Sequence, residues 1–202
     1  MRRMGLRMLG AMAALALAAA SAPAAEPPKP EELIRNLISV KAVEYDFVQF
    51  NPRGEQVSGI VKVQRPGKVR FEYDQPSPLT VVADGRSLGV NNRKLGTWTL
   101  YPLDKTPLGF ILDSAYDPGR LKTVSADVTG NITSVVVSDP SVFGDSRIRL
   151  VFDNTDGALR QWTVTDSTKQ ETTVILYNPR TDMTFGGRDF EIPYSEIRAG
   201  SR

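Results

Sequence analysis

The chain has 202 residues and contains neither cysteine nor histidine. Without these side chains it has no Ser-His-Asp or Cys-His catalytic group and no imidazole or thiolate ligand for zinc. When three arginines of an N-terminal targeting segment are set aside, 22 basic and 23 acidic residues remain, and this net charge of −1 gives no electrostatic basis for binding nucleic acid.

The first residues have the pattern of a secretory signal peptide. Three arginines within the first seven residues precede an apolar, alanine-rich run over 6–20, and Ala-Pro-Ala at 22–24 offers a cleavage site between small residues. We predict a cleaved signal peptide over 1–25 and a single domain over 26–202. An uncleaved membrane anchor is the alternative, but the run is shorter than the roughly 20 apolar residues that span a membrane.

A short amphipathic helix is predicted after this segment. Pro30 can occupy the first helical position, and two glutamates follow it in the first turn, where negative charge is favourable. Leu33 and Leu37 lie on one helical stripe. Because a helix of about three turns is not stable alone, its apolar face must lie on another part of the protein.

The segment from 43 to 73 alternates apolar and polar residues with the period of two that β-strands show. The apolar residues predicted to share one face of the sheet are Val43, Tyr45, Phe47, Val61, Val63, Phe71 and Tyr73. Arg65 falls on the same face, at the turn Arg65-Pro66-Gly67. Because a buried unpaired charge is costly, Arg65 either lies at the rim in water or holds something over the apolar face.

Further strands follow, separated by turn residues. Residues 79–83 form a short strand, and the next strand, 94–101, places Trp98 and Leu100 on one face, which we expect to be the concave apolar one. The remaining predicted strands cover residues 123–128, 132–138, 147–152, 158–166, 172–177 and 189–192. About eleven strands at this spacing are typical of an antiparallel sandwich or barrel, and a single sheet of this size tends to curl.

One segment, 104–121, interrupts the β pattern. Thr106 can cap a helix that begins at Pro107, and Asp117-Pro118-Gly119 marks its end. Its apolar stripe consists of Leu108, Ile111 and Leu112. Gly109 is expected to weaken this helix by about 1 kcal/mol. The two helices are the natural cover for the concave face of the sheet, although a barrel with an ordinary helix-packed core is the alternative.

Six short motifs give the chain a resemblance to the LolA family of periplasmic carriers of outer-membrane lipoproteins. They are Phe47-x-Gln49, Gly59-x-Val61-x-Val63-x-Arg65-Pro66, Arg70-Phe71, the Asp84-Gly85 turn, Thr106-Pro107-Leu108 and Phe190-x-Ile192-Pro193. No single motif is specific, but their order and spacing behind a signal peptide are, and the resemblance extends from Leu33 to Tyr194.

The resemblance implies a mainly β (α+β) fold: an unclosed antiparallel β-barrel of about eleven strands, with a concave apolar face covered by a lid of short α-helices. Arg65 occupies the position whose arginine reaches backbone carbonyls of the lid and holds it shut. The lid pieces are residues 33–39 and 107–114, with Leu33, Leu37, Leu108, Ile111 and Leu112 facing inward. The expected lipid-binding cavity is lined by Val43, Tyr45, Phe47, Val61, Val63, Phe71, Tyr73, Trp98 and Leu100.

The implied function is that of a periplasmic chaperone, not an enzyme, that binds the acyl chains of lipoproteins released from the inner membrane and carries them to the outer membrane. Its expected partners are acylated lipoproteins, an inner-membrane lipoprotein-releasing ABC transporter of the LolCDE type and an outer-membrane acceptor of the LolB type. A monomer is expected, with no catalytic residue, cofactor, metal or nucleic-acid partner.

Three alternatives remain open at this point. The same cavity can serve a carrier of free lipids. The fold is also used by non-enzymatic envelope sensors of the RseB type, which have an additional C-terminal domain. An enzyme ranks last, because carboxylates within reach of each other inside the cavity are required, and the inward-facing residues of the predicted strands are apolar.

Overall fold

The computed structural model describes residues 27–113 and 122–199, so the predicted signal peptide and the predicted turn at 117–119 lie outside the described residues. The strands are β1 Ala42–Phe50, β2 Gln56–Gln64, β3 Lys68–Tyr73, β4 Leu79–Asp84, β5 Ser87–Asn92, β6 Thr97–Pro102, β7 Lys122–Thr129, β8 Ile132–Ser138, β9 Arg147–Asp153, β10 Leu159–Thr165 and β11 Glu171–Arg180. The helices are α1 Pro30–Ser39, η1 Leu103–Lys105, α2 Pro107–Leu112, α3 Pro140–Phe143, η3 Gly187–Phe190 and α4 Tyr194–Ala199.

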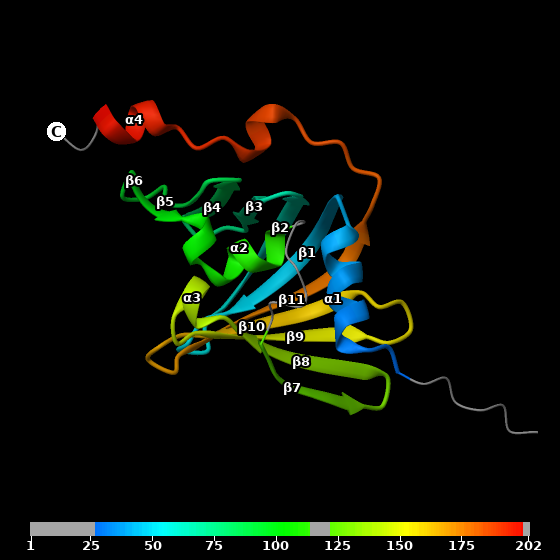
Figure 1. Cartoon of the computed structure of the whole chain (residues 1–202). Helices are drawn as coiled ribbons and strands as arrows, with labels where there is room; N and C mark the ends of the chain where they lie inside the picture. Colours follow the sequence, from blue (N-terminus) through cyan, green and yellow to red (C-terminus); the bar gives the residue numbers. More distant parts are fainter. Residues whose placement is uncertain (1–26, 114–121, 200–202) are drawn as a thin grey trace, which may run out of the picture.

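All eleven strands form one antiparallel sheet that is not closed into a barrel (Figure 1). Its strand order is β6-β5-β4-β3-β2-β1-β11-β10-β9-β8-β7, so two meanders, β1–β6 and β7–β11, meet where β1 pairs with β11. The edge strands are β6 and β7. The predicted fold class, an unclosed antiparallel sheet of about eleven strands with short helices, is confirmed.

The position of α2 follows from this topology. The chain leaves the sheet at one edge, β6, and re-enters it at the other edge, β7. The connection therefore has to cross a face of the sheet, and η1 and α2 are the first part of it. Helix α1 contacts α2, and the two lie together in front of the strands (Figure 1). Both bury apolar side chains in the core cluster on the concave face.

Aromatic residues of neighbouring strands make the centre of this core. Phe47 on β1 is fully buried, and its ring meets the rings of Phe71 and Tyr73 edge-on with centroids 5.2 Å apart. Phe71 in turn packs edge-on against Trp162 of β10. Such pairs stabilise a core beyond the area that they bury. The core thus joins strands from both meanders.

The C-terminal segment covers the convex face instead. The prediction of a strand at 189–192 is wrong, because these residues end the 3₁₀ helix η3 and continue as irregular chain. The Asp189 carboxylate accepts a hydrogen bond from the Gly186 backbone N–H, which fixes the helical turn. Phe190 and Ile192 are both buried, and η3 contacts β3 and β4, although neither residue belongs to the main core cluster.

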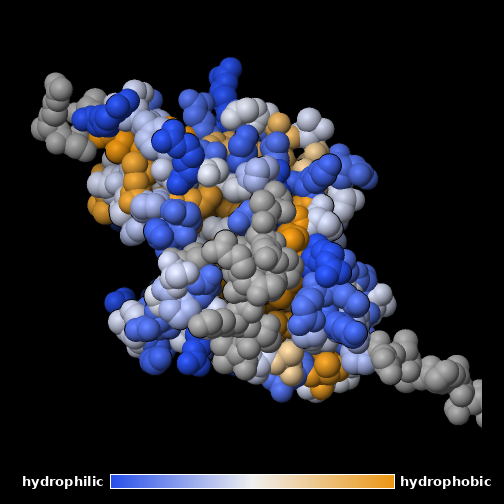
Figure 2. All heavy atoms as spheres, viewed as in Figure 1, coloured by the Kyte–Doolittle hydropathy of each residue, from blue (hydrophilic) through white to orange (hydrophobic). Residues whose placement is uncertain are grey.

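Three smaller features concern turns and the C-terminal tail. Asn91 and Asn92 are the last residues of β5, and the turn follows at 93–96. Asp139-Pro140 opens helix α3. Helix α4 was not expected at all. On the face shown in Figure 2, apolar side chains are visible in a band right of centre and in a group at the upper left, while hydrophilic ones cover most of the rest.

Candidate functional site

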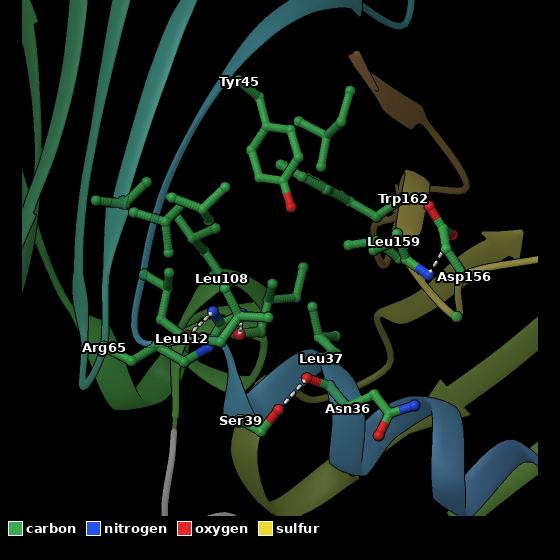
Figure 3. Close-up of a pocket in the computed structure, with 18 residues that line it drawn as sticks. Asn36, Leu37, Ser39, Tyr45, Arg65, Leu108, Leu112, Asp156, Leu159 and Trp162 are labelled. Atoms are coloured by element: carbon green, nitrogen blue, oxygen red, sulfur yellow. Dashed lines mark hydrogen bonds between the residues drawn. The ribbon is translucent and has the colours of Figure 1, made fainter. Parts of the chain in front are cut away.

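A cavity of about 240 Å³ lies between the two helices and the concave face of the sheet (Figure 3). Its lining comes from α1, α2, strands of both meanders and the turn between β9 and β10. The lining residues are Asn36, Leu37, Ser39, Val40, Val43, Tyr45, Val63, Arg65, Val69, Leu108, Ile111, Leu112, Asp156, Gly157, Ala158, Leu159, Trp162 and Leu176. Most of these side chains are apolar, and the polar ones are few and widely spread along the sequence.

Arg65 joins the ends of both helices. Its Nη1 donates a hydrogen bond of 2.8 Å to the carbonyl oxygen of Val40, which caps the C-terminus of α1. Its Nη2 donates one of 2.9 Å to the carbonyl oxygen of Ile111 in α2 (Figure 3). The last carbonyls of a helix have no partner within it, and a positive charge near them is favourable. One guanidinium therefore satisfies two helix ends at once.

The rest of the β2–β3 turn holds α2 as well. The backbone N–H of Gly67 donates a hydrogen bond of 3.0 Å to the carbonyl oxygen of Leu112, the last residue of α2. Gly67 has a φ of +72° and leaves only the space of a hydrogen beside Gly85, since a Cβ would lie 2.8 Å from the Gly85 Cα. The turn Arg65-Pro66-Gly67 is thus attached to α2 through backbone and side chain.

Burial changes the acid–base properties of two lining residues. It lowers the pKa of the Arg65 guanidinium to about 10, which still leaves it charged near neutral pH. It also raises the pKa of Tyr45 above its ordinary value, against the smaller opposite effect of the Arg65 charge. The cavity lining therefore contains one buried cation and one neutral phenol among mostly apolar side chains, with Asn36, Ser39 and Asp156 as its other polar residues.

Four of the five predicted lid residues line the cavity: Leu37, Leu108, Ile111 and Leu112. The fifth, Leu33, is fully buried in the core and does not line it. The second lid piece was expected over 107–114, whereas α2 ends at Leu112 and residue 114 lies outside the described ranges.

Gly109 has a structural purpose in α2 that the sequence did not reveal. A Cβ at this position would lie 2.1 Å from the carbonyl oxygen of Leu103. Only glycine lets α2 pack this closely on η1. Its backbone N–H also donates a hydrogen bond of 3.1 Å to the Thr106 hydroxyl, which caps the helix as predicted. The absence of a side chain at Gly109, which lowers its helix propensity, is therefore what allows the tight bend before α2.

The predicted wall residues divide into three groups. Val43, Tyr45 and Val63 line the cavity. Phe47, Val61, Phe71 and Tyr73 lie on the same face but are buried in the core beside it. Trp98 and Leu100 form the third group, which is treated next. The start of β1 and the end of β2, which lie beside Arg65, thus face the cavity. The core residues in the middle of these strands pack beside it.

The expectation that Trp98 and Leu100 line the cavity is wrong. Paired residues of antiparallel strands share a face, and the pairing places Leu100 opposite Gly89 and Gly89 opposite Val82. Val82 pairs with Arg70, which lies on the convex side. Trp98 and Leu100 therefore cover the convex face, where a Cβ on Gly89 would collide with the Trp98 ring.

Sequence reasoning missed the part of the wall that comes from the second meander. Leu159 and Trp162 on β10 and Leu176 on β11 all line the cavity. On β11, Val174 and Leu176 lie two positions apart, a spacing that could have predicted that their side chains share one face of the sheet. On β10 the signal is broken, because the pairing register shifts between Leu159 and Gln161 and places residues three apart on the same face.

The described residues offer neither a metal site nor a membrane helix. Within the described ranges, no three aspartates or glutamates come together in a way that could hold a metal ion. No helix between residues 27 and 113 or between 122 and 199 has the length and apolar character to cross a membrane. The arrangement provides a mostly apolar space that two short helices cover and that has one buried cation in its lining.

The fold and the site define a class of protein: an open antiparallel sheet whose concave apolar face is covered by short helices. Within that class, the family model described as outer membrane lipoprotein carrier protein LolA matches residues 38–193, well over half of the chain. The chain belongs to the LolA family of lipoprotein carriers.

Individual proteins that resemble this chain in sequence support the family assignment, at modest sequence identity. The chain is similar to an outer-membrane lipoprotein carrier protein from Chromobacterium violaceum, at 25% identity over 84% of this chain and 85% of that protein. It is also similar to a protein of the same name from Nitrosomonas europaea, at 29% identity over 60% of this chain and 61% of that protein. An uncharacterized conserved protein from Thermus thermophilus shares the fold, with a TM-score of 0.50 at 8% identity over 82% of this chain and 95% of that chain.

Proposed function

We propose that this protein is a periplasmic chaperone that binds the acyl chains of lipoproteins released from the inner membrane and carries them to the outer membrane. Its partners in this proposal are a lipoprotein-releasing ABC transporter of the LolCDE type and an acceptor of the LolB type. Family membership supports the general role, and the closed cavity supports the way in which cargo is bound and released.

The observation that carries the proposal is the bridge that Arg65 makes between α1 and α2 over an apolar cavity. At about 240 Å³ the cavity is smaller than the roughly 300–1,000 Å³ of pockets for drug-sized ligands, so an acyl chain enters only when the lid moves. In the closed form Leu108, Ile111 and Leu112 fill the space that the chain would take. Lid and lipid therefore compete for one surface.

The energies of this competition are of comparable size. Each buried methylene is worth about 0.8 kcal/mol, so one long acyl chain gains on the order of 10 kcal/mol from shelter. The lid loses its own apolar contacts in exchange, together with the bonds of Arg65. Hydrogen bonds to a charged group contribute about 1.5–3 kcal/mol. Arg65 thus favours closure and release without preventing loading.

The test is native mass spectrometry of the protein purified from a Gram-negative periplasm. A bound triacylated lipoprotein is the expected result. A bound free lipid would retain the cavity and the lid but would contradict lipoprotein cargo. Residue-level confirmation comes from a crosslinker at Leu37 or Leu108: labelling should fall on the acylated N-terminus of the cargo, and crosslinks elsewhere on the cargo would contradict binding of acyl chains in this cavity.

A further inference from the structure

Two residues in the cavity lining, Arg65 and Tyr45, each have a hydrogen-bond donor with no partner among the described residues. The Nε of Arg65 is buried and unbonded, although both terminal nitrogens of the same side chain are bonded to lid carbonyls. Among the residues that the structure describes, none makes a hydrogen bond with the hydroxyl of Tyr45. Figure 3 shows this hydroxyl pointing into the cavity, across from the helices. The rest of the lining is mostly apolar and includes Val43, Val63 and Trp162, with Asp156 as its one acidic residue.

The Arg65 Nε–H and the Tyr45 hydroxyl would both be satisfied by a ligand atom that accepts hydrogen bonds. Buried polar groups in proteins are nearly always hydrogen-bonded, because an unsatisfied one costs about 1–3 kcal/mol. A guanidinium can only donate, and a phenol hydroxyl donates readily. The complementary group is an oxygen that accepts hydrogen bonds and is attached to an otherwise apolar body. A saturated hydrocarbon cannot satisfy either donor.

Opening of the lid makes the need larger. When α2 moves away, Arg65 loses the carbonyl of Ile111 and with it one of its two acceptors. A charge in an apolar space that has lost its partners is strongly unfavourable. The ligand must therefore supply an oxygen that accepts a hydrogen bond from Arg65. Without one, the free-energy cost of the unpaired guanidinium opposes loading.

We propose that Arg65 and Tyr45 form a polar anchor for the carbonyl oxygen of an ester- or amide-linked acyl chain. This inference rests on the proposed function and specifies the ligand chemistry of the same cavity. In the empty protein the guanidinium holds the lid carbonyls, and in the loaded protein it holds a carbonyl of the ligand. The exchange keeps the charge paired in both states and selects acyl esters and amides over plain hydrocarbons.

The chain contains its own reporter for a test. It has two tryptophans, of which Trp162 lines the cavity and Trp98 lies on the convex face. In a Trp98→Phe background, fluorescence reports only on Trp162. We would titrate this protein with methyl decanoate and with decyl methyl ether, which have the same length but differ in the carbonyl. The expected result is about tenfold tighter binding of the ester, as one charge-assisted hydrogen bond provides.

Two variants locate the effect. Tyr45→Phe keeps the ring and removes the hydroxyl, and it should lower the preference for the ester to about threefold or less. Tyr177→Phe is the matched control: it makes the same chemical change at an exposed residue of β11 and should leave the preference unchanged. A preference that survives Tyr45→Phe in full would overturn the role of this hydroxyl.

The outcomes separate this inference from the proposed function. Equal binding of ester and ether to the Trp98→Phe protein overturns the anchor and leaves acyl-chain binding intact. No response to either probe contradicts both. Repeating the titration with a triacylated lipopeptide and with phosphatidylglycerol distinguishes the two sources of acyl carbonyls. In the anchor model, Tyr45→Phe weakens whichever of them binds, and insensitivity of both to this change overturns it.

Discussion

The two faces of the sheet are covered by segments that are held in different ways. On the concave face, α1 and α2 pack apolar side chains into the core, and the charge of Arg65 bonds only to backbone carbonyls. On the convex face, the C-terminal segment is held by side-chain charges: Lys62 lies 3.1 Å from the carboxylate of Asp189, and Arg70 donates to its backbone carbonyl. Phe190 and Ile192 add a small apolar contact.

In the proposed mechanism this difference decides which cover is exchanged for lipid. An acyl chain would replace the apolar contacts of the lid, and its carbonyl would replace the carbonyls that Arg65 holds. It has no charge with which to replace the carboxylate of Asp189. On this proposal the same sheet has one cover that a lipid displaces and one that it does not. Four predictions test this contrast, from the largest expected effect to the smallest.

Phe47→Ala should have the largest effect on stability. Its ring is fully buried between Phe71 and Tyr73, and truncation of such a residue costs about 3–5 kcal/mol. Phe190→Ala on the convex face should cost less, because its segment can detach and the loss cannot exceed the free energy of docking it. Urea unfolding followed by circular dichroism measures both, and equal losses would contradict the contrast.

Arg65→Leu should make release of cargo slower. Removal of hydrogen bonds to a charged group takes about 1.5–3 kcal/mol from the closed form, which is a change of tenfold or more in the closed-to-open ratio. The assay follows transfer of a loaded lipoprotein to acceptor membranes. Arg65→Lys keeps the charge but lacks the forked guanidinium that bridges two carbonyls. Its rate of transfer should fall between those of the unchanged protein and Arg65→Leu. Unchanged transfer in Arg65→Leu would refute the role of this bridge.

Acid should loosen the convex cover and leave the lid in place. The hydrogen bond from Lys62 holds the pKa of Asp189 below its usual value. A carboxylate with a lowered pKa stabilises the fold above its unfolded-state pKa, near 3.9, and this contribution is lost as the pH falls through the folded-state value. We expect a lower protection factor against hydrogen exchange for the Asp189 amide below about pH 4, and none of this change at the Gly67 amide bonded to Leu112.

A substitution separates this effect from general acid sensitivity. Asp189→Asn at neutral pH should reproduce the lower protection near η3, since it removes the charge that Lys62 faces. Because the pair is partly exposed to solvent, the loss of global stability should stay within about 1 kcal/mol. If the Gly67 amide responds as strongly as the Asp189 amide, the two covers are not independent.

Trp98→Phe should have the smallest effect. The residue lies near the edge of the sheet on the convex face and is partly exposed, so its change should alter stability by about 1 kcal/mol or less. It should leave the fluorescence response to acyl probes intact, whereas Trp162→Phe should abolish it. If Trp98→Phe lost the fluorescence response, Trp98 would have to line the cavity, and its assignment to the convex face would be wrong.

The sequence predicted the strands better than their faces. The run Ile132–Ser138 was predicted with the bounds that the structure has, because alternation is local. Which face an apolar strand turns inward is not local. Trp98 and Leu100 alternate as expected, yet their face depends on pairing through Gly89 and Val82 back to Arg70. The convex face also has an apolar cover there, so an apolar stripe did not identify the concave side.

The site shows the same limit. Arg65 could be placed on the inward face because it lies two positions after Val63 and the alternation continues into the turn. Leu159 and Trp162 could not, because the irregular pairing before Gln161 changes the period from two to three. The need for Gly109 was hidden as well, since it depends on a carbonyl of η1 that comes close only in the folded chain.

The course of the chain between the two edges of the sheet has a kinetic consequence. Since α2 belongs to the connection from β6 to β7, it is tethered at both ends and cannot diffuse away when lipid displaces it. A tethered competitor acts at a fixed effective concentration, which for short flexible connections is about millimolar. The lid therefore weakens lipid binding by a constant factor at any concentration of protein. The competition between lid and bound lipid should therefore be the same in a dilute solution and in a crowded one.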